Sequence, residues 1–158
     1  MAPLPEIPWE NGVIQQGAFE DRSEWYAFTG PDGEAINGPG GWYRVDLVIE
    51  NGHYVGARYA TTNGQPARIH GIPDPDRQPF VTQKVSHDGH PAPKGDAAWS
   101  GWFAARDDQG RLTALSLNYY ERPVVPVDPG WATMKVEYGA DGTHKRAFYD
   151  ADGQIVIQ

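Results

Sequence analysis

The sequence predicts an all-β fold, an antiparallel meander of about 8–10 short strands built from repeated hairpins, as a curled sheet or a closed barrel. Asn-Gly or Asp-Gly pairs recur along the chain and indicate type I′ turns, in which both central residues have positive φ. Runs rich in Val, Ile, Leu and aromatic residues separate these pairs. No long stretch shows the helical period of about 3.6 residues, so strands and turns must supply the scaffold.

The strands are predicted in chain order. In residues 42–50, Val45 and Leu47 alternate with Arg44 and Asp46, which is the period of a half-buried strand. Residues 80–86 are predicted to form a lone strand, and residues 155–157 a terminal one. Four strand pairs are predicted: 13–19 with 24–29, 42–50 with 53–60, 99–106 with 112–120, and 131–138 with 143–149.

The hairpins indicate an internal repeat. A Gly-Trp pair opens each of three units, and a strand, a turn, a strand ending in an aromatic residue and a second turn follow it. The pairs are Gly41-Trp42, Gly101-Trp102 and Gly130-Trp131. Because one hairpin cannot bury its apolar face alone, neighbouring copies must extend one sheet or close it.

We therefore expect a single β domain over residues 1–158. Its parts are an entry arm with the first hairpin (1–40), a repeat hairpin (41–70), proline-rich loops with one strand (71–98), and two further repeat hairpins (99–129 and 130–158).

The C-terminal part resembles a known kind of repeat. Residues 135–138 (Lys-Val-Glu-Tyr), Asp141-Gly142 and residues 148–153 (Phe-Tyr-Asp-Ala-Asp-Gly) resemble the Tyr-Asp and Asp-Gly hairpin repeats of bacterial proteins. Such repeats occur in polymorphic-toxin shells and in small antitoxin-like proteins. The resemblance covers about 60 residues and involves turn and aromatic positions only. It implies structural repetition and a toxin-system context.

Composition and motifs exclude several classes of function. The absence of cysteine excludes a disulfide scaffold, a cysteine zinc site and a thiol nucleophile. A net charge of −8 argues against a nucleic acid or an anionic membrane as partner. We find no catalytic motif, and we expect no cofactor and no metal site, although His70, His87, His90 and Asp96 are candidate ligands. Without a signal-like segment at the start of the sequence, a cytoplasmic location is expected.

The favoured function is non-catalytic binding of a basic partner protein, as an immunity protein neutralises a toxin. An acidic face on a rigid sheet steers a basic partner and speeds association. The two exposed edge strands of a sheet also invite formation of a homodimer. The predicted binding residues are five acids and two aromatic anchors: Asp74, Asp76, Asp107, Asp108, Glu121, Trp102 and Tyr120.

The alternative is a small β-barrel that binds an apolar small molecule, as a cyclase or isomerase acting by shape. Trp99 and Trp102 are three apart and should face opposite sides of a strand, so one of them should contact a partner or a barrel interior. An enclosed apolar cavity would favour the barrel, whereas a filled core with an exposed acidic and aromatic patch would favour protein binding. The residues predicted to line the lumen are Trp25, Trp42, Tyr59, Phe103 and Tyr119.

Overall fold

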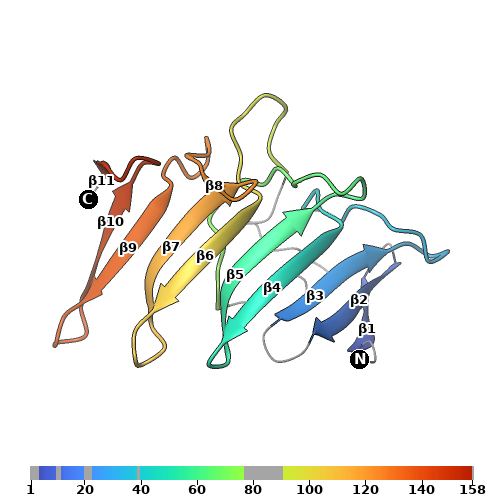
Figure 1. The fold of residues 1–158 in the computed structure, drawn as a ribbon, viewed down its shortest axis with the longest axis horizontal. Helices are drawn as coiled ribbons and strands as arrows, with labels where there is room; N and C mark the ends of the chain where they lie inside the picture. Colours follow the sequence, from blue (N-terminus) through green and yellow to red (C-terminus); the bar gives the residue numbers. More distant parts are fainter. Residues whose placement is uncertain (1–3, 10–11, 20–22, 39, 77–90, 158) are drawn as a thin grey trace.

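The computed structural model describes residues 4–9, 12–19, 23–38, 40–76 and 91–157, and these form one antiparallel sheet without a helix (Figure 1). Ten of the strands follow one another across the sheet in chain order, and β8 pairs with β7 beside this path. The predicted antiparallel meander is therefore confirmed. The strands are β1 (Leu4–Trp9), β2 (Gly12–Phe19), β3 (Ser23–Thr29), β4 (Arg44–Glu50), β5 (His53–Ala60), β6 (Gly101–Arg106), β7 (Leu112–Tyr119), β8 (Arg122–Pro123), β9 (Thr133–Tyr138), β10 (His144–Tyr149) and β11 (Ile155–Ile157).

The sheet is open. In the described part of the chain, β1 pairs with β2 and β11 pairs with β10, and these two strands lie at opposite ends of the sheet (Figure 1). The curled sheet is confirmed and the closed barrel is wrong, because closure requires the first and last strands to pair. The strand predicted for residues 80–86 lies outside the described residues.

The core lies on one face of the sheet, here called the inner face, to which Val45, Leu47, Trp102, Leu115 and Met134 belong. Segments between β5 and β6 cover the middle of this face, and they contribute the buried residues Ala67, Ile69 and Trp99. The opposite face, here called the outer face, includes Arg44, Val48, Phe103 and Lys135. One layer of strands thus obtains a core by folding its own connecting segments onto one side.

Aromatic side chains form a continuous row within this core. The ring centroids are 4.8 Å apart for Phe28 and Trp42, 5.2 Å for Trp42 and Tyr59, and 5.7 Å for Tyr59 and Trp99. The last two pairs pack edge to face, an arrangement worth about 0.5–1.5 kcal/mol beyond area burial. Burial raises the pKa of Tyr59 to about 12, since the phenolate would lose its hydration.

The turn geometry differs from the prediction at most of the Asx-Gly pairs. Asn51 and Gly52 both have positive φ, as a type I′ turn requires. At four other pairs that the structure describes in full, the glycine has positive φ and the preceding Asp or Asn does not. The loop that starts at Gly139 is typical, since the N–H of Gly139 donates to the Thr143 oxygen (2.7 Å) and the N–H of Gly142 donates to the Gly139 oxygen (3.1 Å). This is a three-residue loop with a glycine bulge. The glycines concerned are Gly33, Gly64, Gly142 and Gly153.

The repeat is present in the backbone, but one of its starting points was predicted incorrectly. The N–H that follows Trp42, Trp99 and Trp131 donates in each case, at 2.8 Å, to a residue at the end of the second strand of the same hairpin; these residues are Ala60, Asn118 and Tyr149. Trp99, and not Trp102, is therefore equivalent to Trp42 and Trp131. Trp99 precedes β6 and is bridged to Ile69, while Trp102 lies on the inner face, so both indoles are buried. The expectation that one of them contacts a partner or a barrel interior is wrong.

Candidate functional site

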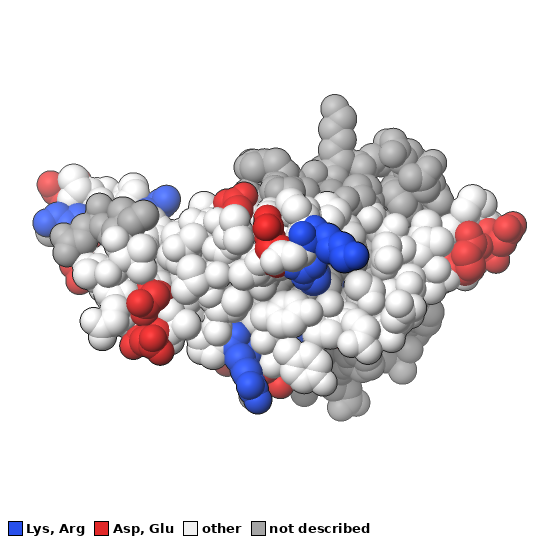
Figure 2. All heavy atoms as spheres, turned by 90° about the horizontal axis from the view of Figure 1, so that it is seen from above, with Lys and Arg blue, Asp and Glu red and all other residues white. Residues whose placement is uncertain are grey.

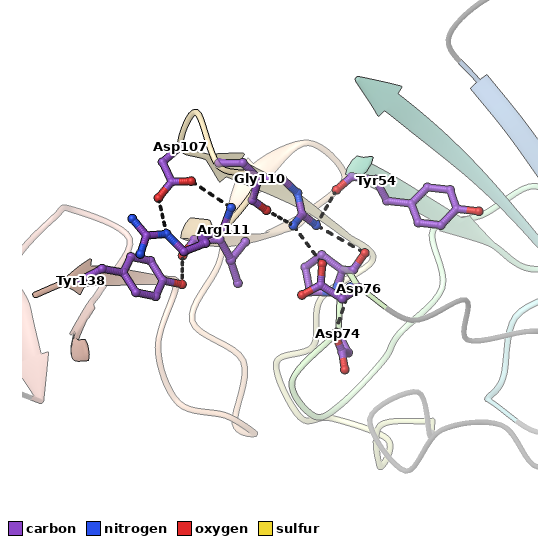
Figure 3. Close-up of polar contacts among 10 residues, drawn as sticks. Tyr54, Asp74, Asp76, Asp107, Gly110, Arg111 and Tyr138 are labelled. Atoms are coloured by element: carbon purple, nitrogen blue, oxygen red, sulfur yellow. Dashed lines mark hydrogen bonds and ion pairs between the residues drawn. The ribbon is translucent and has the colours of Figure 1, made fainter. Parts of the chain in front are cut away.

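Four of the predicted acids lie together beside the turn between β6 and β7, at the bottom of the view in Figure 1 (close-up in Figure 3). Asp107 and Asp108 belong to this turn, and Asp74 and Asp76 belong to the loop that packs beside it. Glu50, at the end of β4, lies on the other side of the turn and lines the same hollow as Asp107 and Asp108. We call these five carboxylates the acidic rim.

Arg106 holds the parts of the rim together. Its Nη1 donates to Asp76 Oδ1 at 2.8 Å and to the Gly110 oxygen at 3.0 Å. Its Nη2 donates to the oxygen of Tyr54 at 3.2 Å and to that of Pro75 at 3.5 Å. The side chain is only 8% exposed. The planar, always charged guanidinium is suited to several acceptors at once, so one side chain ties three separate segments together.

Asp107 organises the turn itself. Its Oδ1 accepts hydrogen bonds from the N–H groups of Gln109 and Arg111, both at 2.9 Å, and its Oδ2 accepts one from Arg111 Nε at 2.8 Å (Figure 3). Desolvation alone would raise the pKa of the Asp107 carboxyl, but these hydrogen bonds and the Arg111 charge outweigh it and lower that pKa. The carboxylate is therefore ionised at neutral pH.

Arg111 extends this arrangement toward β9. Its guanidinium carbon lies 4.3 Å from the centroid of the Tyr138 ring, and the Tyr138 hydroxyl donates to the Leu112 oxygen at 2.7 Å. The cation is thus held between a carboxylate and an aromatic face. This shows that the surface next to the rim already accommodates one guanidinium.

A groove of about 760 Å³ runs from the rim over the inner face of β7, β9 and β10. Asp74, Asp76, Arg111, His144 and Arg146 supply the charged or titratable groups of its lining. Its floor is apolar and consists of Leu115, Trp131, Met134, Val136 and Phe148. An apolar floor with a few charged groups around it is the usual composition of a binding site. The groove is open at the surface and is not a barrel lumen.

A second hollow, of about 730 Å³, separates the β6–β7 turn from the β4–β5 turn. His53 lies against this turn so closely that a Cβ on Gly110 would be 2.7 Å from His53 Nε2. Gly110 also has a φ of 80°, in the left-handed region that favours glycine. The identity of Gly110 therefore fixes how closely the two turns approach each other.

The remaining predicted binding residues lie elsewhere. Trp102 is 2% exposed in the core, so its predicted role as a partner anchor is wrong. Tyr120 and Glu121 are exposed in the turn between β7 and β8, at the opposite edge of the sheet, where Glu121 pairs with Arg58. In the view of that edge in Figure 2, acidic groups are scattered among Lys and Arg and form no continuous field.

The residues predicted to line a barrel lumen do not face a common space. Trp42 and Tyr59 belong to the core, and Tyr119 is half-buried. Phe103 is 54% exposed on the outer face, and the register places Trp25 on that same face, where the Arg44 guanidinium lies over its ring at 4.7 Å. The lumen prediction is wrong because the open sheet has two separate faces.

Glu50, Arg106 and Arg111 were missed by the sequence analysis. Arg111 has a local signal, because it is the fifth residue of a turn that Asp107 opens, and an Asp at the start of such a turn can accept hydrogen bonds from the fifth residue. Arg106 gives no such signal, because its partners Pro75 and Asp76 are about thirty residues away in the sequence.

Comparisons of the chain with protein-family models, with curated proteins and with solved structures found no match. Within the described residues, no group of three or more His, Asp or Glu side chains is placed to hold a metal ion. The candidate ligands His87 and His90 lie outside those residues. No helix in the described segments has the length and apolar character needed to span a membrane.

Proposed function

We propose that this chain is a non-catalytic protein-binding module that holds a basic segment of a partner protein against the acidic rim and in the adjoining groove. One observation carries the proposal. Five carboxylates from three segments that are distant in the sequence gather around the β6–β7 turn, where Asp74 and Asp76 line the groove with the apolar floor and the other three line the hollow next to it. Neither local turn chemistry nor solubility requires acids from separate segments to meet around one turn.

The electrostatics of the rim favour a cationic ligand. Arg106 and Arg111 compensate Asp76 and Asp107, whereas no ion pair involves Glu50 or Asp108 among the described residues. The rim therefore keeps an excess of negative charge, in a chain whose net charge is −8. Such a field raises the association rate of a basic partner and weakens as salt increases.

The groove adds an apolar contribution. A Lys or Arg side chain can lay its aliphatic stem on the floor formed by Leu115, Met134 and Phe148 while its charged head reaches Asp74. Arg111, His144 and Arg146 also line the groove, and these basic side chains disfavour a uniformly basic ligand. The segment expected to fit best alternates basic with apolar residues. Neutralisation of a toxin's basic site, in the manner of an immunity protein, is one form this binding could take.

Defined peptides test the proposal by fluorescence anisotropy at low and high salt. We expect a labelled peptide of alternating Leu and Lys to bind, and to bind more weakly as salt increases. Peptides in which Glu replaces Lys, or Gly replaces Leu, should bind far more weakly. Equal binding of the Leu–Glu peptide would contradict the proposal.

A matched pair of double variants locates the binding surface. Asp74→Asn with Asp108→Asn removes two rim charges but keeps an acceptor for the N–H of Asp76, which Asp74 Oδ1 accepts at 2.9 Å. Asp32→Asn with Asp152→Asn makes the same charge change in two exposed turns away from the rim. We expect the rim variant to weaken peptide binding about 3–10-fold and the control to change it less than about twofold. Equal effects would mean that net charge, not the rim, attracts the peptide.

A further inference from the structure

The outer face carries a second feature, which the proposed function does not use. Two hollows, of about 280 and 300 Å³, meet beside β5 and β7 and share Arg58, Asn118 and Glu121. The first also involves Tyr120, and the second also involves Val48 and Phe103. We call the two together the outer hollow.

The side-chain amide of Asn118 forms the floor of the outer hollow. Asn118 is only 8% exposed and lines both halves, yet its side chain makes no hydrogen bond with any described residue. Its cross-strand neighbour is Gly101, which has no side chain, and a Cβ there would be 3.0 Å from Asn118 Oδ1. Because the amide lines both hollows, solvent can reach it. The amide is thus available to a ligand that offers both a donor and an acceptor.

The border of the outer hollow is charged but can open. Arg58 and Glu121 form an ion pair across it, with side chains that are 68% and 59% exposed. Such an exposed pair contributes little to stability, so a ligand can displace it at little cost. Opening the pair would present one cation and one anion beside Asn118.

The turn that carries Glu121 is unusual for its residues. Tyr120 and Glu121 have φ values of 51° and 67°, and neither is Gly or Asn. The N–H of Tyr120 donates to Ser100 Oγ at 3.0 Å, which holds the turn in place. The two residues are the central positions of the turn between the paired residues Tyr119 and Arg122, and a type I′ turn requires positive φ at both. The turn fixes the positions of both side chains at the border of the hollow.

The walls of the hollow are apolar. Phe103 and Val48 are both exposed on the outer face, and the strand between them contributes Gly56, whose missing side chain leaves the space open. A Cβ on Gly56 would lie 3.4 Å from the Phe103 ring. This half of the hollow has room for one apolar side chain next to the Asn118 amide.

We infer that the outer hollow binds an extended peptide segment, with one peptide group hydrogen-bonded to Asn118 and the neighbouring apolar side chain packed against Phe103. A peptide group has one hydrogen-bond donor and one acceptor, which match the acceptor and donor of the Asn118 carboxamide. In an extended peptide, an apolar side chain can lie next to that peptide group. The outer hollow and the acidic rim lie on different parts of the molecule, so this inference does not depend on the proposed function.

The test uses N-acetyl-phenylalanine methylamide as the probe and the amide resonances of the isotope-labelled protein as the readout. We expect the probe to shift the resonances of the Asn118 side-chain amide saturably, with a Kd in the millimolar range, which corresponds to a binding free energy of about 4 kcal/mol. Methyl 3-phenylpropionate, which has the ring but no peptide group, should bind much more weakly. Equal binding of the ester, or shifts confined to the rim and groove, would overturn the inference.

Substitutions separate this site from the rim. Asn118→Ala and Phe103→Ala should each weaken probe binding about fivefold or more, whereas the rim variant Asp74→Asn with Asp108→Asn should leave it unchanged. Phe103→Ala alters an exposed side chain, so it remains informative if Asn118→Ala fails to fold. Probe affinity that stays within about twofold in Phe103→Ala would overturn the inference.

Discussion

Arg106→Met should destabilise the protein by about 2 kcal/mol, because it removes the guanidinium that ties three segments together. A hydrogen bond from a charged donor is worth about 1.5–3 kcal/mol, and the Gly110 and Tyr54 oxygens would each lose one. The contact with Asp76 adds little, because that carboxylate is 63% exposed. Recovered desolvation of the buried guanidinium offsets part of the loss. Methionine preserves most of the aliphatic volume, so the result reports mainly on the polar contacts.

Urea unfolding at constant pH measures this loss, and thermal unfolding should show a decrease in Tm of roughly 4–8 °C. Asp76→Asn is the matched control, and we expect it to cost less than about 1 kcal/mol. Arg106→Lys keeps the charge but not the fork of donors, so its stability should resemble that of Arg106→Met. Arg106→Met should also weaken binding of the Leu–Lys peptide, because the loop that carries Asp74 and Asp76 would no longer be held. Near-wild-type stability in Arg106→Met would refute the reasoning.

Two further predictions concern the sheet and the core. Gly101→Ala should destabilise by roughly 1–3 kcal/mol in urea unfolding, since the added Cβ would lie 2.5 Å from the Ala57 oxygen. Replacing a glycine within a strand by alanine normally increases stability. If Gly101→Ala did so, the strands could separate without cost and the reasoning would be wrong. Tyr59 should ionise near pH 12 in an absorbance titration. Because the folded state raises this pKa above the value of about 10 in the unfolded chain, the stabilisation is complete below pH 10 and disappears as the pH rises through 12. Tyr59→Phe should therefore lose less stability than the wild type between pH 10 and pH 12. If both proteins lose stability equally over this range, burial of Tyr59 is not the cause.

The hairpins were predictable because their signals are local. In β4, Val45 and Leu47 alternate with Arg44 and Asp46, and Asn51-Gly52 supplies the positive φ angles that reverse the chain. The turn type at the other Asx-Gly pairs was not predictable, since the same dipeptide fits a two-residue loop and a three-residue loop with a bulge. Here the Asp side chain favours the longer loop, as in Asp150, whose Oδ1 accepts hydrogen bonds from the N–H groups of Asp152 and Gln154.

The candidate site was predictable only in part. Asp107 and Asp108 were recognised as turn acids, but their meeting with Asp74, Asp76 and Glu50 depends on how far the loop after β5 folds back over the sheet. The repeat register failed at Trp99 for a related reason, because a strand's starting residue is set by its neighbour and not by its own composition.

By itself, the sequence determined that this protein is an antiparallel meander, because the alternation of side chains and the positive-φ turns act over a few residues. The tertiary structure alone decided that the sheet stays open, that Trp102 is buried in the core, and that the acids meet around the β6–β7 turn. Each of these depends on contacts between residues far apart in the chain, such as the guanidinium of Arg106 with Asp76, and no local pattern encodes such contacts.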